Sequence, residues 1–292
     1  ALKEGREMAS NIAHVVDTHQ HLWVMSERAY DWIVPEYGIL NNDFRPEDVA
    51  EDSAKAGITA TVLVQAADTY DDTFYMLSVA RAYESVKGVV GWVPFNKPTE
   101  ARESLDLFDH NSYIKGYRNL THNYSDPRWI LQASCKETLA DISKRDLSLD
   151  MVSVNSDHSR AIVELADALP NLRIVVDHMA KPNIAEKQWD DWADDMAELA
   201  KRSNVYVKHS GLNTASGQGW TAASWEPYIN FCLEKFGSNR MMMGSDWPVS
   251  LLNGDFLGVW AAQMESISKL SQSEQEDICY KTAQSFYKLN LG

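Results

Sequence analysis

Short apolar runs recur along the chain, and stretches with helical periodicity separate most of them. The runs are rich in Val, Ile and Leu without strict alternation, which is typical of strands that are covered on both faces. Eight runs predict strands, at His14–His19, Thr59–Gln65, Gly88–Val93, Tyr113–Arg118, Leu147–Val152, Leu172–Asp177, Val205–Lys208 and Met241–Ser245.

The stretches between these runs carry helix signals. Pro46–Ala56 begins with Pro at the first helical position and ends at Gly57, a common pair of start and stop signals. After Asp255 we expect a helix that completes the last repeat and an extra C-terminal helix, at Ser273–Tyr287. The other predicted helices are Tyr70–Tyr83, Pro127–Lys144, Ser156–Leu169, Gln188–Arg202 and Trp225–Phe236.

Strands that alternate with helices favour right-handed crossovers and a parallel sheet. Eight such units in 292 residues fit a closed (β/α)8 barrel, also called a TIM barrel, of the α/β class. An open, doubly wound sheet is the alternative, but no G-x-G-x-x-G follows a predicted strand, which argues against its nucleotide-binding form. No Pro/Gly/Ser-rich linker interrupts the pattern. We therefore predict one barrel domain over residues 1–292, with residues 1–13 as an N-terminal lead segment and residues 24–44 as a loop over the barrel mouth.

Composition excludes several classes of partner. The formal net charge of −15 disfavours binding to nucleic acid and to anionic membrane surfaces, and no apolar stretch is long enough to span a bilayer. The three cysteines are widely spaced and form no C-x-x-C motif, which suits buried thiols in a reducing compartment. These features favour a cytoplasmic protein that acts on a small molecule.

The two ends of the predicted strands differ in polarity. The C-terminal ends carry polar residues, whereas the N-terminal ends carry nothing comparable. Barrel enzymes place their chemistry at the C-terminal face, so these residues are expected to meet in space. They are His19-Gln20-His21, Gln65, Arg118, Asp177-His178, Lys208-His209-Ser210 and Ser245-Asp246.

The strongest candidates lie on the first and last strands. His19 and His21 are two residues apart and should face the same side of a strand, where they can converge on one metal ion or substrate atom. In a closed barrel the last strand neighbours the first, which would bring Asp246 beside them. Its carboxylate could take a proton from water or complete a metal site. The alternative is an Asp that caps the turn before Pro248.

Other candidates surround this group. His178, after the sixth strand, adds a third imidazole, and the guanidinium of Arg118 can hold a carboxylate or polarise a carbonyl. Lys208 and His209 end the seventh strand, and the pattern leaves open which of them faces the site. Lys208 is a candidate for substrate binding, and so is His122, in the loop after the fourth strand.

Tryptophan is abundant, with ten residues, and several fall where the barrel mouth is expected. Flat apolar rings with a polar edge suit sugar faces and other ring substrates. Trp23, Trp92 and Trp247 are therefore candidate substrate contacts, together with Trp32 in the mouth loop. The alternative is that these rings only pack the loops.

Several of these motifs together resemble a known family. VVDTHQHLW, YDW followed by DFRPEDVA, VLVQAA, GVVGWV, DHMAKP and MMGSDWPV are similar to the amidohydrolase superfamily, and most closely to its lactonase branch of sugar-lactone and 2-pyrone-4,6-dicarboxylate hydrolases. The likeness runs from about residue 14 to the C-terminus. It implies a (β/α)8 barrel that hydrolyses a lactone ester, with Asp246 activating water, His19, His21 and His178 lining the site, and Arg118 gripping the substrate.

The chain departs from the two-metal members of that superfamily. The resemblance implies that those members have a His at the end of strand 5 and a bridging Lys or Glu on strand 4. This chain has Asp150 on strand 5 and Arg118 on strand 4. A binuclear centre is therefore not expected. His19, His21, His178 and Asp246 remain candidate ligands of one zinc or manganese ion, and the resemblance also implies that some members of the branch work without a metal. A mononuclear metal-dependent amidohydrolase or decarboxylase is the alternative enzyme, and a sugar-binding barrel is the non-enzymatic one.

Overall fold

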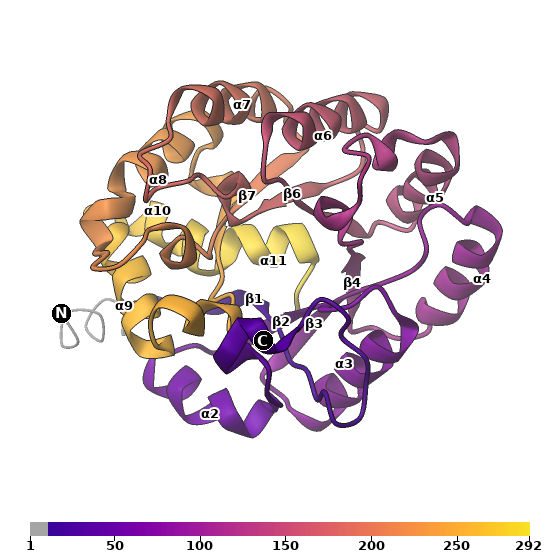
Figure 1. The fold of residues 1–292 in the computed structure, drawn as a ribbon, viewed down its shortest axis with the longest axis horizontal. Coiled ribbons are helices and arrows are strands. Elements are labelled where there is room, and N and C mark those ends of the chain that lie inside the picture. Colours follow the sequence, from indigo (N-terminus) through magenta and orange to yellow (C-terminus); the bar gives the residue numbers. More distant parts are fainter. Residues whose placement is uncertain (1–10) are drawn as a thin grey trace.

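The strands follow one another around the sheet in chain order (Figure 1). In the computed structural model, which describes residues 11–292, the sheet has eight strands, and all neighbouring pairs from β1–β2 to β7–β8 are parallel. The chain meets the first strand just beyond the end of the last strand, where the N–H of Asp246 donates to the carbonyl of His19 at 2.7 Å. The predicted (β/α)8 barrel is therefore confirmed. The strands are β1 (Val16–Gln20), β2 (Ala60–Val64), β3 (Val86–Gly91), β4 (Ile114–Tyr117), β5 (Ser148–Val152), β6 (Ile174–Asp177), β7 (Val205–His209) and β8 (Met241–Met243).

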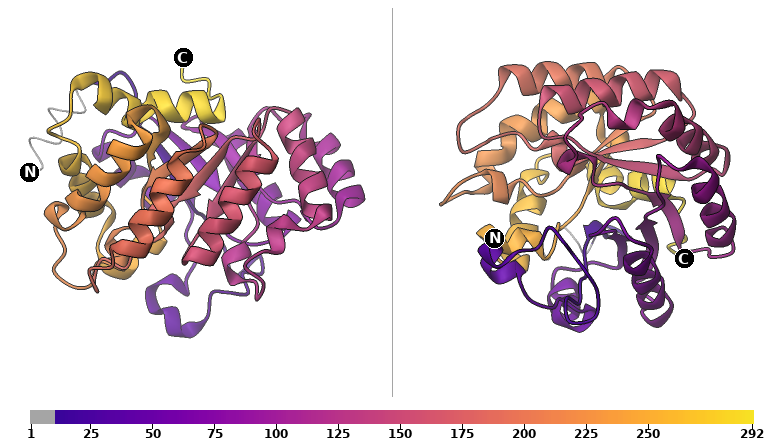
Figure 2. Two further views of the ribbon diagram at one scale, coloured as in Figure 1. Left: turned by 90° about the horizontal axis from the view of Figure 1, so that it is seen from above. Right: turned by 45° about the vertical axis from the view of Figure 1, so that its right-hand side comes forward.

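Helices connect successive strands and form the outer layer (Figure 2). After α9, a continuous helical stretch follows, in which α10 leads through a π-helical turn at Asp277–Lys281 into α11. This stretch corresponds to the extra C-terminal helix expected at Ser273–Tyr287. The helices are α2 (Pro46–Lys55), α3 (Tyr70–Ala82), α4 (Pro98–Phe108), α5 (Ala133–Lys144), α6 (Ser156–Ala168), α7 (Asp190–Ala200), α8 (Ala222–Phe236), α9 (Phe256–Ser266), α10 (Gln272–Glu276) and α11 (Thr282–Tyr287).

The C-terminal helix covers one end of the strands. In Figure 2, α11 (yellow) lies across that end. Its Phe286 and Tyr287 pack among buried side chains inside the barrel, including Val16 and Ala60 at the starts of β1 and β2. Because α11 covers the N-terminal end of the barrel, the opposite end, where the polar residues gather, is left for a binding site.

Some elements differ from the sequence-based expectations. Helix α4 was not expected, because most of its residues are charged or polar. Only Ala101, Leu105 and Phe108 are buried. Helix α5 begins at Ala133 instead of Pro127, since Trp129–Leu131 forms a separate 3-10 turn. The bounds of β1, β3, β6 and β8 are each shifted by two residues at one end or both. These differences leave the order of the elements unchanged.

Residues 24–44 form a loop that is fastened to the barrel at several points. Trp23 and Phe44 form an antiparallel bridge at its base. Within the loop, the hydroxyl of Tyr30 donates to Asp72 at 2.8 Å, and Nε1 of Trp32 donates to the carbonyl of Ala66 at 2.6 Å. The loop is therefore tied to the connection between β2 and α3.

Two further predictions concern the chain as a whole. Most of the predicted N-terminal lead segment, residues 1–10, lies outside the described residues. Across the helices of residues 11–292, none combines the length and the apolar character needed to cross a bilayer.

Candidate active site

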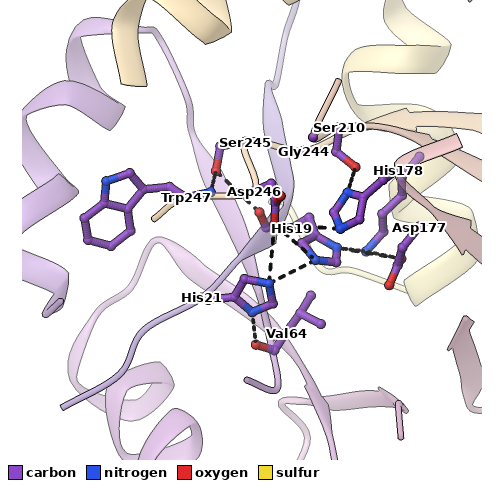
Figure 3. Close-up of polar contacts among 12 residues, drawn as sticks. His19, His21, Val64, Asp177, His178, Ser210, Gly244, Ser245, Asp246 and Trp247 are labelled. Carbon is purple, nitrogen blue, oxygen red and sulfur yellow. Dashed lines mark hydrogen bonds and ion pairs between the residues drawn. The ribbon is translucent and has the colours of Figure 1, made fainter. Parts of the chain in front are cut away.

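Three imidazoles surround the carboxylate of Asp246 at the C-terminal end of the barrel (Figure 3). Oδ1 of Asp246 lies 3.5 Å from Nε2 of His21, 3.7 Å from Nε2 of His178 and 3.8 Å from Nε2 of His19. The Nε2 atoms of His19 and His21 are 3.2 Å apart. The strand order thus brings together four residues that the sequence places as far apart as positions 19 and 246.

The seam between β1 and β8 depends on two local features. A Cβ atom on Gly244 would lie 2.6 Å from Cβ of His19, so only glycine allows this approach. The carboxylate of Asp17 accepts hydrogen bonds from the N–H of Ser245 at 2.8 Å and from its hydroxyl at 2.6 Å. Asp17 therefore braces the seam and, unlike His19 and His21, does not join the group around Asp246.

His178 projects from a left-handed turn. Four consecutive residues, His178 to Lys181, have positive φ angles of 56°, 51°, 57° and 46°, a conformation that costs L-residues about 1–2 kcal/mol each. The surroundings hold the turn in place, because the carbonyl of Met179 accepts a hydrogen bond from Nε1 of Trp192 at 2.7 Å. Nδ1 of His178 lies 2.7 Å from the hydroxyl of Ser210, which fixes the ring with Nε2 toward Asp246.

Arg118 is buried on the wall of the site. Its Nη1 donates to Asp177 at 3.1 Å, and Nε and Nη2 donate to the side chain and the carbonyl of Gln65. Only 4% of Arg118 is exposed, yet it lines the cavity above Asp246. A guanidinium has five N–H donors, so two remain for a ligand.

Lys208 and His209 point in opposite directions. Nζ of Lys208 lies inside the barrel, fully buried, 2.7 Å from Asp150 and 3.1 Å from Nδ1 of His19. Nε2 of His209 lies 2.9 Å from the hydroxyl of Ser266 in α9. Lys208 is therefore the residue that faces inward, although it lies beneath His19 and not on the cavity wall, where a direct contact with substrate was expected.

A cavity of about 260 Å³ opens above Asp246. Arg118 and Lys181 make its wall cationic on a protein of net charge −15, whereas burial lowers the pKa of the third basic side chain there, His122, to about 3 and leaves it neutral. Within residues 11–292, Nδ1 of His122 is buried without a hydrogen-bond partner. The remaining lining residues are His21, Trp32, Tyr37, Leu40, Ala66, Leu120, Asn123, Val152, His178, Thr214, Val249 and Leu252.

Of the four tryptophans predicted at the mouth, Trp32 lines the cavity and the other three lie elsewhere. In the described part of the chain, Trp23, Trp92 and Trp247 do not line this cavity. Trp23 is fully buried 5.4 Å from Trp32, Trp247 packs on Phe44, and Trp92 packs on Tyr70 of α3. The aromatic lining comes instead from Trp32 and Tyr37, which the mouth loop supplies. Lining residues such as Thr214 and Leu252 carry no motif that could have marked them.

Burial controls the ionisation of the group. Burial lowers the pKa of His178 to about 3 despite the nearby Asp246, and it lowers the pKa values of His19 and His21 as well. Burial alone would raise the pKa of Asp246, but the neighbouring His178 and His21 outweigh it and leave the pKa below its usual value. At neutral pH the site therefore holds an ionised carboxylate beside neutral imidazoles.

The residues of this group fit a single divalent cation. His19, His178 and Asp246 can each offer one ligand atom, and these atoms lie within 4.8 Å of one another. Imidazole nitrogens and carboxylate oxygens are common zinc ligands at about 2.0–2.2 Å. Oδ1 of Asp246 lies 3.8 Å from Nε2 of His19 and 3.7 Å from Nε2 of His178, separations that two ligands of one such ion can have.

A second group of possible ligands lies deeper, at His19, Asp150 and Asp177. Here the ammonium of Lys208 already lies between the acidic groups, 2.7 Å from Asp150 and 3.6 Å from Asp177. Burial and the neighbouring Asp150 raise the pKa of Asp177 well above its usual value. For Asp150, Lys208 outweighs burial and lowers the pKa. The ammonium of Lys208 thus supplies a positive charge between these acidic groups.

Comparison with known proteins identifies the family. The model of the amidohydrolase family matches residues 16–289, nearly the whole chain. The chain belongs to the amidohydrolase family. This amidohydrolase is 36% identical to an L-fucono-1,5-lactonase from Burkholderia ambifaria over 252 residues, which is 86% of each chain. It is 29% identical to an L-fucono-1,5-lactonase from Burkholderia multivorans, over 94% of this chain and 96% of the relative.

Solved structures of similar proteins share the barrel of this amidohydrolase. An amidohydrolase from Burkholderia multivorans with bound zinc superposes with a TM-score of 0.88 at 27% identity, covering 95% of this chain and all of the other. A protein from Acinetobacter baumannii described as a probable 2-pyrone-4,6-dicarboxylic acid hydrolase superposes with a TM-score of 0.76 at 16% identity, over 94% and 99% of the two chains. The second likeness concerns the fold alone.

Proposed function

We propose that this amidohydrolase opens a sugar lactone to its acid, with Asp246 as the base that activates water. The relatives at 36% and 29% identity, both L-fucono-1,5-lactonases, support a lactone-hydrolysing function. The observation that carries the proposal is the buried, ionised Asp246 at the floor of a small cavity with a cationic wall.

In the proposed mechanism, the water attacks the lactone carbonyl as Asp246 removes its proton. Negative charge then develops on the carbonyl oxygen, and preorganised donors in a site shielded from water stabilise it. Arg118 has two N–H groups free for this purpose, and the imidazoles beside Asp246 form the rest of the surrounding wall. Asp246 finally returns the proton to the ring oxygen as the C–O bond breaks.

His19, His178 and Asp246, with His21 beside them, are the residues that would hold a divalent cation such as zinc or manganese. When bound, the cation would supply Lewis-acid polarisation. The proton transfer by Asp246 is the same with or without it, because the carboxylate already faces the cavity.

The upper part of the cavity would hold the sugar. The rings of Trp32 and Tyr37 line it and offer flat apolar surfaces of the kind that pack against sugar faces. The unpartnered Nδ1 of His122 is a buried polar atom that a sugar hydroxyl can satisfy. The product acid would be held near Arg118 and Lys181, since both are cationic and line the same cavity.

The test is a panel of aldonolactones followed with a pH indicator, because each hydrolysis releases a proton. The protein is first treated with a chelator, and the panel is then run with no metal, with zinc and with manganese. We expect at least one aldonolactone to be opened far faster than its spontaneous hydrolysis. Failure to open any lactone under all three conditions would contradict the proposal. Metal-dependent decarboxylation of a carboxylic acid or cleavage of an amide, in parallel assays with such substrates, would favour the alternative enzyme.

A further inference from the structure

The ammonium of Lys208 is held inside the barrel by one acceptor for each of its protons. Nζ lies 2.8 Å from the carbonyl of Thr18, 2.7 Å from Oδ2 of Asp150 and 3.1 Å from Nδ1 of His19. Lys208 and Asp150 are both fully buried. An ammonium has three N–H donors and no lone pair, so in this arrangement every donor is used.

This contact determines which nitrogen of His19 carries the proton. Because Lys208 can only donate, Nδ1 of His19 must accept, and a neutral ring then carries its hydrogen on Nε2. The other acceptor near Nδ1 is Oδ1 of Asp177, at 3.7 Å, which is too far for a hydrogen bond. The geometry therefore favours one tautomer.

The next ring is arranged to receive that hydrogen. Nδ1 of His21 lies 2.8 Å from the carbonyl of Val64, which can only accept, so the hydrogen of His21 is on Nδ1. Its Nε2 thus has a lone pair, and it lies 3.2 Å from Nε2 of His19. From Lys208 through His19 and His21 to Val64, each N–H has an acceptor and each acceptor has a donor.

We propose that Lys208 is a positioning residue that fixes His19 in the tautomer with its hydrogen on Nε2, and so keeps His19 a hydrogen-bond donor to His21. His19 in turn holds His21 beside Asp246. Lys208 also supplies a positive charge between Asp150 and Asp177, where a second cation would otherwise be needed. The proposal rests on the proposed function only in treating the group around Asp246 as the active site.

The same tautomer has a consequence for metal binding. A histidine that binds a metal through one nitrogen normally donates its other N–H to a carboxylate, a carbonyl or water. For Nε2 of His19 to bind a cation, the ring would have to carry its hydrogen on Nδ1, where the neighbouring Lys208 is itself a donor. Lys208 is thus expected to weaken the binding of a cation at His19, although His178 and Asp246 remain available.

The C-terminal helix supports this arrangement from below. The hydroxyl of Tyr287 in α11 donates to Oδ1 of Asp150 at 2.6 Å, and its ring lies 5.3 Å from Nζ of Lys208. Tyr287 has no such contact with His19 in the described structure. It therefore offers a control, because its hydroxyl can be removed without touching the contact between Lys208 and His19.

The test reads the tautomer directly by NMR. Long-range proton–nitrogen correlation spectra of protein labelled with 15N-histidine show which ring nitrogen is protonated, and a His19→Gln variant assigns the His19 signals. In the unaltered protein we expect His19 protonated at Nε2 and unprotonated at Nδ1. A spectrum with the proton on Nδ1 would overturn the proposal, and this result needs no variant of Lys208 to fold.

A double variant tests the cause. Lys208→Met with Asp150→Asn removes the ammonium and its carboxylate together, so that neither charge is left unpaired, and Tyr287→Phe is the control. We expect the double variant to lose the single His19 tautomer and to bind zinc at least about tenfold more tightly in equilibrium dialysis, whereas Tyr287→Phe keeps both properties. Unchanged His19 signals and zinc affinity in the double variant would contradict the proposal. Neither readout uses a lactone, so failure of the proposed function would be seen separately.

Discussion

The backbone of Gly211 lies directly against the imidazole of His178. A Cβ atom at position 211 would stand 2.9 Å from Nδ1 of His178 and 3.1 Å from Oδ2 of Asp246, and Gly211 has a φ of +64°. We therefore expect Gly211→Ala to displace both side chains. Since a shift of about 1 Å in an active site can cost roughly 10²-fold in rate, kcat/KM for the best lactone should fall by about that factor.

Gly217→Ala is the matched control. Gly217 has a similar φ of +70°, but its Cβ would meet only Ala185, at 3.4 Å. Both variants should lose about 1–2 kcal/mol in the free energy of unfolding, because alanine is strained in the left-handed region, while only Gly211→Ala loses activity. Equal loss of activity in the two variants would mean that backbone strain, and not crowding of the site, is the cause.

Asp72 of α3, which accepts a hydrogen bond from Tyr30 of the mouth loop, is expected to confer a pH dependence on stability. Burial raises the pKa of Asp72 to about 6, even though hydrogen bonds from Ala66 and Tyr30 and the charge of Arg118 oppose it. Because the folded-state pKa exceeds the unfolded one, this contribution is complete below about pH 4 and is lost as the pH rises through about 6. Raising the pKa of Asp72 to about 6 corresponds to a change of about 3 kcal/mol in the free energy of unfolding across this pH range.

The measurement is urea unfolding of the unaltered protein and of Asp72→Asn between about pH 4 and 7. The unaltered protein should lose stability relative to the variant as the pH rises across this range. Tyr30→Phe removes a hydrogen bond that favours the ionised carboxylate, so the loss should move to higher pH in that variant. A difference between the unaltered protein and Asp72→Asn that is constant with pH would contradict the raised pKa.

His122 is expected to affect binding and not the chemical step. His122 lines the cavity, and its buried Nδ1 has no partner in the described structure, so His122→Phe should raise KM for a sugar lactone by about two- to tenfold, the worth of one hydrogen bond, and leave kcat nearly unchanged. His122→Asn keeps a polar atom close to the position of Nδ1 and should restore part of the affinity. An unchanged KM in the Phe variant would remove His122 from the sugar site.

Much of the fold and the centre of the site could be predicted because they follow from strand order. The polar residues stand where parallel strands end, and closing the barrel necessarily places Asp246 of the last strand beside His19 of the first. His178 joins them because it also follows the end of a strand. In each case the side chain lies within a few residues of a regular element, so its position is set by the sheet.

The parts that could not be predicted depend on where side chains point once the strand has ended. Trp23 and Trp247 come a few residues after the ends of β1 and β8, and their rings pack against Phe44. Lys208 is still on its strand, but its long side chain runs inward beneath His19. The rings that do line the cavity, Trp32 and Tyr37, lie in a loop whose path is set by contacts such as that of Trp32 with Ala66.

The most direct measurement is the turnover number of Asp246→Asn with the best aldonolactone of the panel. Asparagine has almost the shape of aspartate but cannot accept the proton of water, so we predict a fall in kcat of about 10²- to 10⁴-fold. Far-ultraviolet circular dichroism should be unchanged. Asp255→Asn is the control, since Asp255 only caps α9 and asparagine caps a helix equally well. If Asp246→Asn hydrolysed the lactone at nearly the rate of the unaltered protein, Asp246 would not be the base and the account would be wrong.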